Sequence, residues 1–327
     1  MLYDDAFLVV LERGLREALP LWGLAPDTPC RLLTVSENAT FLVEPPGRRI
    51  VMRVQRPGYN SEAEIRSELA WLAALRDGDV VPTPAPIPLA DGAPLARFDA
   101  GGTRMLIACF EFMPGLPPDE TGDLVAWFAT LGEMTARLHD HARRWSPPAG
   151  FVRRVWDWQS CIGPDADWGD WRSGIGLGHE GRAVLERAVA HLRERTDAYG
   201  RDAARWGLIH ADMKPANLLA EGTRLGVIDF DDCGMGWFMF DFAASVSGLE
   251  CDPRLGALQA SWLEGYRRVA PVASEDEAIL RALVLLRRIQ LTAWAAGHSE
   301  TPLGQSAGAG FTVGTVELAE RYLSEHG

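Results

Sequence analysis

The amino-acid sequence predicts an α+β fold in two lobes, a small antiparallel-sheet lobe followed by a larger, mainly helical lobe. A chain of 327 residues is long enough for two lobes. Short apolar runs bounded by turn residues, which are typical of strands, are concentrated in the first third. Long stretches with apolar residues at helical spacing follow from residue 124 onward. We therefore expect a boundary near residue 112, with lobes over 1–112 and 113–327.

The small lobe is expected to contain two helices and four strands. Residues 5–19 and 61–75 have helical spacing, and the second helix begins with a capping box from Ser61 to Glu64. The proline-rich stretch 80–94 is interpreted as a loop inside this lobe, because a strand that completes the sheet still follows it. The expected strands cover 31–35, 40–43, 49–54 and 105–112.

The large lobe is expected to be mainly helical, and His139 in its first helix is interpreted as structural. In the stretch 151–171, four tryptophans lie among aspartates. Such groups can bind a cation, but we favour a helical insert that packs through its aromatic side chains. Arg281, Arg287 and Arg288 are expected on a solvated helix face. The expected helices cover 124–145, 180–199, 254–269, 274–296 and 312–325.

The stretch from Leu208 to Asp232 contains the strongest functional signal. It has the pattern His-x-Asp-x-x-x-x-Asn over His210 to Asn217, and Asp229 follows twelve residues later in Ile-Asp-Phe. Short apolar runs flank these polar residues, so we expect them in turns at the ends of short buried strands. Asp and Asn are also ordinary turn formers, but that interpretation does not explain their joint spacing.

This spacing fits phosphoryl transfer from a nucleotide, which needs a carboxylate near the attacking hydroxyl and oxygen ligands for Mg²⁺. Asp212 would orient the hydroxyl and accept its proton. The side-chain oxygen of Asn217 and the carboxylate of Asp229 would bind the metal, because Mg²⁺ prefers oxygen ligands.

On these motifs the chain resembles the aminoglycoside phosphotransferase family, which shares the protein-kinase-like fold with choline kinases, type II homoserine kinases and the stress-response kinase A group. The resemblance covers most of the chain and is concentrated in Leu208–Asp241. It implies ATP- and Mg²⁺-dependent phosphorylation of a hydroxyl. It also implies that Asp241 braces the catalytic loop by accepting backbone hydrogen bonds, although an N-cap of the next helix is an alternative role.

The resemblance further implies a nucleotide site with contributions from the small lobe. The hairpin tip with Ser36, Asn38 and Thr40 takes the place of the kinase nucleotide loop, and these side chains would donate hydrogen bonds to phosphate. The tip lacks the Gly-x-Gly-x-x-Gly pattern, and an ordinary polar hairpin is the alternative. Backbone groups of Glu111 and Met113, at the junction of the lobes, would contact adenine.

Arg53 stands where the family has the lysine that binds the α- and β-phosphates. Arginine can hold phosphate through two hydrogen bonds, but its shape differs from that of lysine. The alternative is a surface arginine on an edge strand. Glu68 stands where the family has the glutamate that pairs with this cation, and Glu64, one turn earlier, is the competing candidate.

Asp231 and Asp232 directly follow the metal-binding segment. Three carboxylates within four residues repel one another unless cations or hydrogen bonds compensate them. One of the two is therefore expected to face the acceptor substrate. The alternative is that both cap the local backbone.

Composition excludes some partners. The net charge of −13 argues against general nucleic-acid binding and is compatible with a cationic substrate. The five cysteines are scattered without metal-ligand spacing, so reduced thiols are expected. Met1–Asp5 lacks the basic start of a signal peptide, and no apolar run could span a bilayer. We therefore expect a cytoplasmic protein with no membrane partner.

The sequence leaves three functions open. The first is a kinase that acts on a hydroxyl of a small molecule, and the second is a Ser/Thr protein kinase of the stress-response type. The third is a nucleotide-binding regulator without turnover. The intact Asp212, Asn217 and Asp229 disfavour the regulator, while Arg53 lends it slight support. The acceptor stays unnamed because substrate-contacting residues follow no motif.

Overall fold

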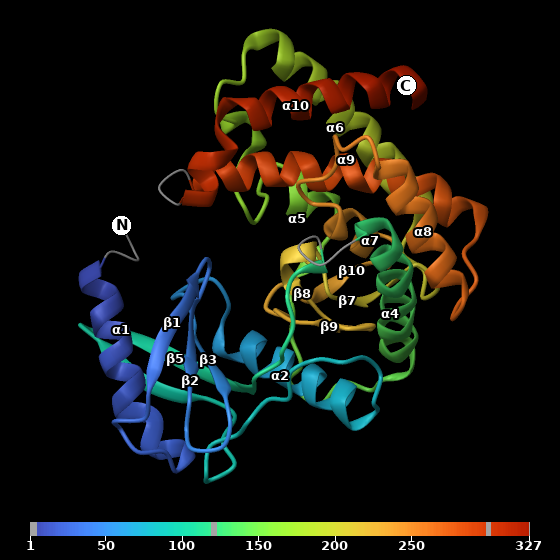
Figure 1. The fold of residues 1–327 in the computed structure, drawn as a ribbon. Helices are drawn as coiled ribbons and strands as arrows, with labels where there is room; N and C mark the ends of the chain where they lie inside the picture. Colours follow the sequence, from blue (N-terminus) through green and yellow to red (C-terminus); the bar gives the residue numbers. More distant parts are fainter. Residues whose placement is uncertain (1–4, 119–122, 299–301, 327) are drawn as a thin grey trace. The chain divides into compact units, whose positions relative to one another are not determined.

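The computed structural model describes residues 5–118, 123–298 and 302–326, with side chains omitted for 302–307 (Figure 1). The start of the chain, on which the expectation about a signal peptide depends, lies mostly outside the described residues. The chain forms two compact units. The first comprises Met1–Pro114, Ser146–Arg153 and Gly226–Asp231, and the second comprises Gly115–Trp145, Arg154–Leu225 and Asp232–Gly327.

The first unit is built on a five-stranded antiparallel sheet with the strand order β1-β2-β3-β5-β4. The four predicted strands are present. The sheet has one more strand, β4, which was not predicted because its sequence Ala-Arg-Phe-Asp-Ala has a weak strand pattern. The central strand is β3, in which Arg53 lies opposite Thr40 of β2 and Ala108 of β5. The strands are β1 (Cys30–Val35), β2 (Ala39–Val43), β3 (Ile50–Val54), β4 (Ala96–Ala100) and β5 (Thr103–Glu111).

Helices flank this sheet. Helix α1 (Asp5–Ala18) and the short η1 (Leu19–Trp22) bury leucines in one core with side chains of β2, β3 and β5. Figure 1 shows α1 beside the strands of this sheet. Helix α2 (Glu62–Asp77) begins with the predicted capping box, in which Ser61 and Glu64 bond to each other's backbone N–H groups. The proline-rich stretch is a loop of this unit, and it bonds to β5 through Ile87.

The second unit is mainly helical, as predicted. Helices α9 and α10 run side by side, and α10 is kinked at Gly308 (Figure 1). Helices α4 and α8 approach closely, because Gly132 faces the carbonyl of Trp262 and Gly265 faces the carbonyl of Ala129. The helices are α4 (Leu124–Arg144), α5 (Trp158–Ile162), η2 (Trp171–Ser173), α6 (His179–Tyr199), α7 (Phe240–Ser245), α8 (Leu255–Arg267), α9 (Ser274–Gly297) and α10 (Pro302–His326).

Short strands place the motif region. Strand β10 (Gly234–Trp237) lies between β6 (Val155–Trp156), which is parallel to it, and the antiparallel β7 (Trp206–Ile209). The loop after β7 contains the His-x-Asp motif and the short helix η3 (Pro215–Asn217). It leads into a two-stranded sheet of β8 (Leu218–Glu221) and β9 (Arg224–Val227). The sequence thus correctly predicted polar residues in turns between short strands.

From Arg154 onward, the aromatic stretch forms an insert in the second unit. Trp156 and Trp171 are fully buried in it, which agrees with the favoured interpretation of packing through aromatic side chains. The insert is less helical than expected, since only the short α5 and η2 are helical.

The five cysteines all lie in the described residues, and none of them forms a disulfide. Across the described ranges, no helix has both the length and the apolar character needed to cross a bilayer.

Candidate active site

The carboxylate of Asp212 is the centre of a buried polar cluster in the second unit. Its Oδ1 atom accepts a hydrogen bond of 2.9 Å from Nη2 of Arg287. Its Oδ2 atom accepts bonds of 2.8 Å from Nζ of Lys214 and 2.7 Å from Nδ2 of Asn217. The side chain is only 9% exposed. Both oxygens are therefore held in place by donors from separate parts of the unit.

These contacts keep Asp212 ionised. Burial, the largest single influence, raises the pKa of the carboxyl, but the positive charges of Lys214 and Arg287 together outweigh it. The net pKa lies below the ordinary value for aspartate. An ionised, oriented carboxylate can accept a hydrogen bond from a substrate hydroxyl.

Arg287 is the site residue that the sequence interpretation missed. The expectation of a solvated face holds for Arg281, which is exposed, but it is wrong for Arg287 and Arg288, which are buried in α9. Arg288 instead pairs with the buried Glu250 at 2.9 Å. The physical reason is that α9 packs against α6, α7 and α10, so it has little solvated face in this region. The run Leu-Val-Leu-Leu-Arg-Arg-Ile-Gln-Leu, apolar on both sides of the two arginines, was the available signal.

Asp241 braces the backbone of the motif loop. It accepts bonds of 3.2 Å from the N–H of His210 and 2.6 Å from the N–H of Ala211. The implied brace is therefore present. The N-cap alternative is wrong, because Asp241 lies inside the first turn of α7, whose N-cap is Met239.

His139 completes this brace and is structural, as interpreted. Its Nε2 lies 2.9 Å from Oδ2 of Asp241, and its Nδ1 lies 2.9 Å from the hydroxyl of Tyr266. The ring is fully buried, and burial lowers the pKa of His139 although the Asp241 carboxylate opposes this. A neutral ring can donate to Asp241 and accept from Tyr266 at the same time.

A second polar cluster lies in the first unit around Arg53. Its Nη2 donates to both oxygens of Glu68, at 2.7 and 2.6 Å, and its Nη1 lies 3.4 Å from Oδ1 of Asp229. Burial lowers the pKa of Arg53, but Glu68, Asp231 and Asp229 raise it above its ordinary value. The guanidinium is therefore a fixed positive charge.

This geometry decides two alternatives. The interpretation of Arg53 as a surface residue on an edge strand is wrong, because β3 is the central strand and Arg53 is 6% exposed. Of the two candidate glutamates, Glu68 pairs with Arg53, while Glu64 belongs to the capping box.

The expected metal ligands present suitable oxygen atoms. Nδ2 of Asn217 donates to the carbonyl and the carboxylate of Asp212, which leaves the amide oxygen as the atom for a metal. The carboxylate of Asp229 is 37% exposed, and its residue has a φ of +64°. Left-handed backbone at a non-glycine residue is strained and is concentrated at functional positions. The donor types fit Mg²⁺.

The hairpin tip differs from a free polar loop. Ser36 is exposed and Thr40 half-buried, but Asn38 is buried. Nδ2 of Asn38 donates to Oδ2 of Asp231 at 2.7 Å, and its Oδ1 accepts from the N–H of Arg56. The expectation that the Asn38 amide donates to phosphate is therefore disfavoured, because protein groups already use it.

The two expected adenine contacts lie at the end of β5. The N–H of Glu111 donates to the carbonyl of Ala85, so this group would not be the one that meets adenine. The carboxylate of Glu111 lies 3.7 Å from Arg76. Met113 follows the strand and is half-buried.

The prediction of an acceptor-facing carboxylate concerns Asp231 and Asp232. Both are buried, and protein groups compensate both carboxylates. Asp231 accepts from Asn38 and lies near Arg53, and Asp232 pairs with Arg154 at 3.5 Å. The repulsion that motivated the prediction is therefore relieved within the protein. An acceptor-facing role for one of the two, and the alternative that both cap local backbone, stay predictions.

The family follows from comparison with known proteins. The profile of the phosphotransferase enzyme family matches residues 31–282, which is most of the chain. The chain belongs to this family. The predicted resemblance and the α+β, protein-kinase-like fold are thus confirmed, and the protein is a phosphotransferase.

Three proteins illustrate the relationship. A microcompartment-associated aminopropanol kinase of known structure is 42% identical and has a TM-score of 0.89, with 95% of this chain and 97% of that chain covered. Amicoumacin kinase of Bacillus subtilis is 25% identical over 71% of this chain and 66% of that protein. The solved amicoumacin kinase hAmiN, in complex with AMP-PNP, Ca²⁺ and Ami, shares the fold with a TM-score of 0.76 at 18% identity, over 96% of this chain and 94% of that one.

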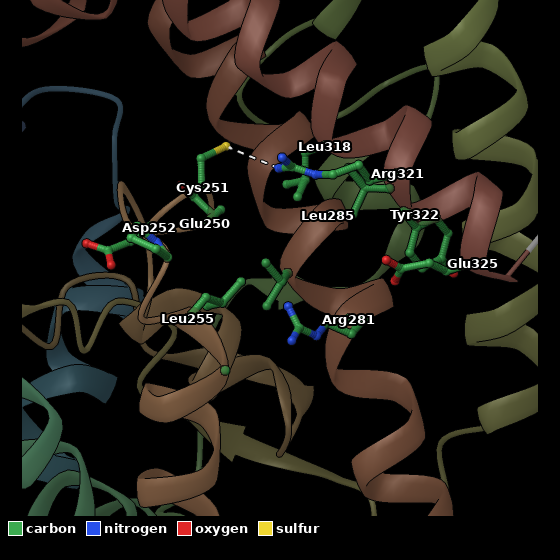
Figure 2. Close-up of a pocket in the computed structure, with 13 residues that line it drawn as sticks. Glu250, Cys251, Asp252, Leu255, Arg281, Leu285, Leu318, Arg321, Tyr322 and Glu325 are labelled. Carbon is green, nitrogen blue, oxygen red and sulfur yellow. Dashed lines mark hydrogen bonds between the residues drawn. The ribbon is translucent and has the colours of Figure 1, made fainter.

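A pocket of about 300 Å³ in the phosphotransferase lies among residues 250–256, α9 and α10 (Figure 2). Arg281 and Arg321 reach it from the two helices, and Nη2 of Arg321 lies 3.8 Å from Sγ of Cys251. None of the described residues that line it was predicted for the site. The pocket also holds carboxylates, so its charge indicates no ligand class.

Proposed function

We propose that this phosphotransferase is an ATP- and Mg²⁺-dependent kinase that phosphorylates the hydroxyl of a small amino alcohol. The observation that carries the proposal is the 42% identity to an aminopropanol kinase over nearly the whole length of both chains. The ionised Asp212 carboxylate supports it, because phosphoryl transfer to an alcohol needs a group that orients the hydroxyl.

In this mechanism Asp212 accepts the hydrogen bond of the acceptor hydroxyl and takes its proton. The hydroxyl oxygen forms a bond to the γ-phosphorus of ATP while the bond from this phosphorus to the β,γ-bridging oxygen breaks, which releases ADP. Three donors already hold the carboxylate, so it acts mainly by orienting the hydroxyl. The amide oxygen of Asn217 and the carboxylate of Asp229 would bind Mg²⁺. Bound Mg²⁺ would neutralise charge on the nucleotide phosphates.

Nucleotide phosphates are the proposed ligands of Arg53. Glu68 fixes the guanidinium, whose remaining N–H groups can donate to phosphate oxygens. Ser36 and Thr40 are the hairpin-tip side chains that we retain as phosphate donors. Near adenine we retain Met113 and the carbonyl of Glu111.

An amino alcohol is also compatible with the charge of the protein. At neutral pH such an acceptor is a cation, and a net charge of −13 raises the local concentration of cations. The same charge disfavours a polyanionic acceptor.

The test is ATP consumption with a panel of acceptors, measured by coupling ADP formation to NADH oxidation. The panel pairs 1-amino-2-propanol and 3-amino-1-propanol with the matched uncharged alcohols 2-propanol and 1-propanol, and adds a basic Ser-containing peptide. We expect turnover with an amino alcohol, its loss with EDTA, and its recovery with Mg²⁺. Turnover of the peptide alone, or equal turnover of charged and uncharged alcohols, would overturn the proposal.

A further inference from the structure

Arg287 is a cation that the fold isolates from solvent. It is 1% exposed and lies in the middle of α9, 75 positions after Asp212. A buried guanidinium is costly unless its N–H groups are paired. Each of its three guanidinium nitrogens accordingly has a polar partner in the fold.

The partners of Arg287 fix it from several directions. Nη1 donates to Oε1 of Gln290 at 3.1 Å, and Nε lies 3.4 Å from Oγ of Ser247. The guanidinium carbon lies 4.8 Å from the ring of Trp168 and 5.9 Å from that of Phe240. The aromatic stretch was considered as a possible cation site, and the cation that lies near Trp168 is the protein's own Arg287. A guanidinium held by two polar groups and two rings is a rigid donor.

The two oxygens of Asp212 are held in different ways. Oδ2 is held by Lys214 and Asn217, which belong to the same loop. Lys214 is 36% exposed, so this part of the support is partly solvated. Oδ1 is held by Arg287, a buried residue of α9 that is distant from this loop in the sequence. Without Arg287, the loop alone would set the plane of the carboxylate.

We propose that Arg287 is a positioning residue that fixes the carboxylate plane of Asp212 and thereby the approach of the acceptor hydroxyl. The inference rests on the proposed function, since it concerns the orienting role of Asp212. It predicts an effect on kcat with little effect on nucleotide binding, because Arg287 supports the group that faces the hydroxyl.

The adjacent Arg288 provides a matched control. It is also a buried arginine of α9, and its Nη1 donates to Glu250 at 2.9 Å. Its other donors bond to Thr315 and to the carbonyl of Phe311. Both arginines have a carboxylate partner and an aromatic neighbour, but only Arg287 contacts Asp212.

The experiment compares Arg287→Met, Arg287→Lys and Arg288→Met by steady-state kinetics, isothermal titration with MgATP, and thermal unfolding. We expect Arg287→Met to lower kcat by about ten- to a hundredfold, with the Kd for MgATP unchanged within about twofold. Arg287→Lys keeps the charge but not the planar fork, so it should recover part of kcat. Arg288→Met should lower Tm while the folded enzyme keeps its kcat. Added guanidinium ion should restore turnover to Arg287→Ala.

Two kinetic results would overturn the inference. One is a folded Arg287→Met or Arg287→Lys enzyme with wild-type kcat. The other is a fall in kcat that follows Tm equally in the Arg287 and Arg288 variants and is not rescued by guanidinium.

Wild-type turnover of the amino alcohols tests the proposed function separately. Crystal structures of the wild type and of Arg287→Lys test the role of Arg287 without an activity assay. The Asp212 carboxylate should rotate from its wild-type position in Arg287→Lys, and an unchanged carboxylate would also overturn the inference.

Discussion

Oδ1 of Asp241 accepts a hydrogen bond of 2.6 Å from the backbone N–H of Ala211, whose φ angle is +67°. A left-handed alanine is strained and persists only where its surroundings hold it. Ala211 directly precedes Asp212, so this bond helps to position the backbone of Asp212, the proposed catalytic residue. Asp241 in turn is fixed by the buried His139.

Replacing Asp241 should therefore damage both stability and activity. In Asp241→Ala, the N–H groups of His210 and Ala211 lose a buried acceptor, which should cost on the order of 3 kcal/mol of unfolding free energy. We expect kcat to fall at least about tenfold. Ser245→Ala in the same helix removes only a hydroxyl bonded to Phe242 and should cost about 1 kcal/mol. Urea denaturation and kinetics of both variants check this, and similar costs for the two would contradict it.

The pair Arg53–Glu68 should behave as a coupled unit. Arg53→Met leaves the fully buried Glu68 without its cation, which should cost about 3–5 kcal/mol. The double variant Arg53→Met with Glu68→Met should recover much of this stability but not MgATP binding. Arg56, partly exposed and 3.3 Å from Glu37, is the control, and Arg56→Met should cost at most about 1 kcal/mol. Full MgATP affinity in the double variant would remove Arg53 from the phosphate site.

Close packing of α8 against α4 leaves no room for a side chain at Gly265. A methyl group there would overlap the carbonyl of Ala129 in α4, so the two helices would have to separate. We expect Gly265→Ala to lower unfolding free energy by about 1–3 kcal/mol or more. Gly256 in the same helix faces open space, and Gly256→Ala should be neutral or slightly stabilising, by at most about 1 kcal/mol. Thermal unfolding distinguishes the two, and equal Tm values would refute the packing argument.

His139 should make stability depend on pH. Its folded-state pKa is lowered by burial, below the ordinary value of about 6.5 that it regains on unfolding. The folded state therefore binds fewer protons near pH 6. This contribution is fully present above the unfolded pKa and is lost as pH falls through the folded pKa.

Unfolding free energy should accordingly fall between neutral pH and pH 5.5, and less steeply in His139→Asn. His141 of the same helix is only partly buried, so His141→Asn should change the slope less. Denaturation curves across this range test the expectation. An identical slope in wild type and His139→Asn would contradict it.

Local sequence signals predicted the features that depend on neighbouring residues. The capping box at Ser61, the strand around Arg53 and the turn with Asp212 each follow from a pattern within a few positions. The brace by Asp241 came from the family resemblance. The capping box, the strand and the turn depend on hydrogen bonds between near neighbours and on the alternation of apolar and polar residues, both of which a short stretch of sequence shows.

Features that depend on distant packing were not predicted. In the sequence, Arg287 looks like an arginine on the surface of a helix. It is buried because other helices pack over its side of α9. The same holds for Asp231, whose partner Asn38 lies 193 positions away. The choice between Glu64 and Glu68 also needed the structure, because both lie in α2, one turn apart. No local pattern in a single sequence shows which distant residue will pair with a charged group.

The most direct test of phosphoryl transfer is ³¹P NMR of ATP, Mg²⁺ and 1-amino-2-propanol incubated with the wild-type enzyme and with Asp212→Ala. The wild type should produce ADP and a new phosphomonoester resonance that depends on the amino alcohol. Asp212→Ala should remain folded and produce it about 10²- to 10⁴-fold more slowly. Formation of inorganic phosphate without the phosphomonoester, or the same rate of phosphomonoester formation in Asp212→Ala, would contradict the account.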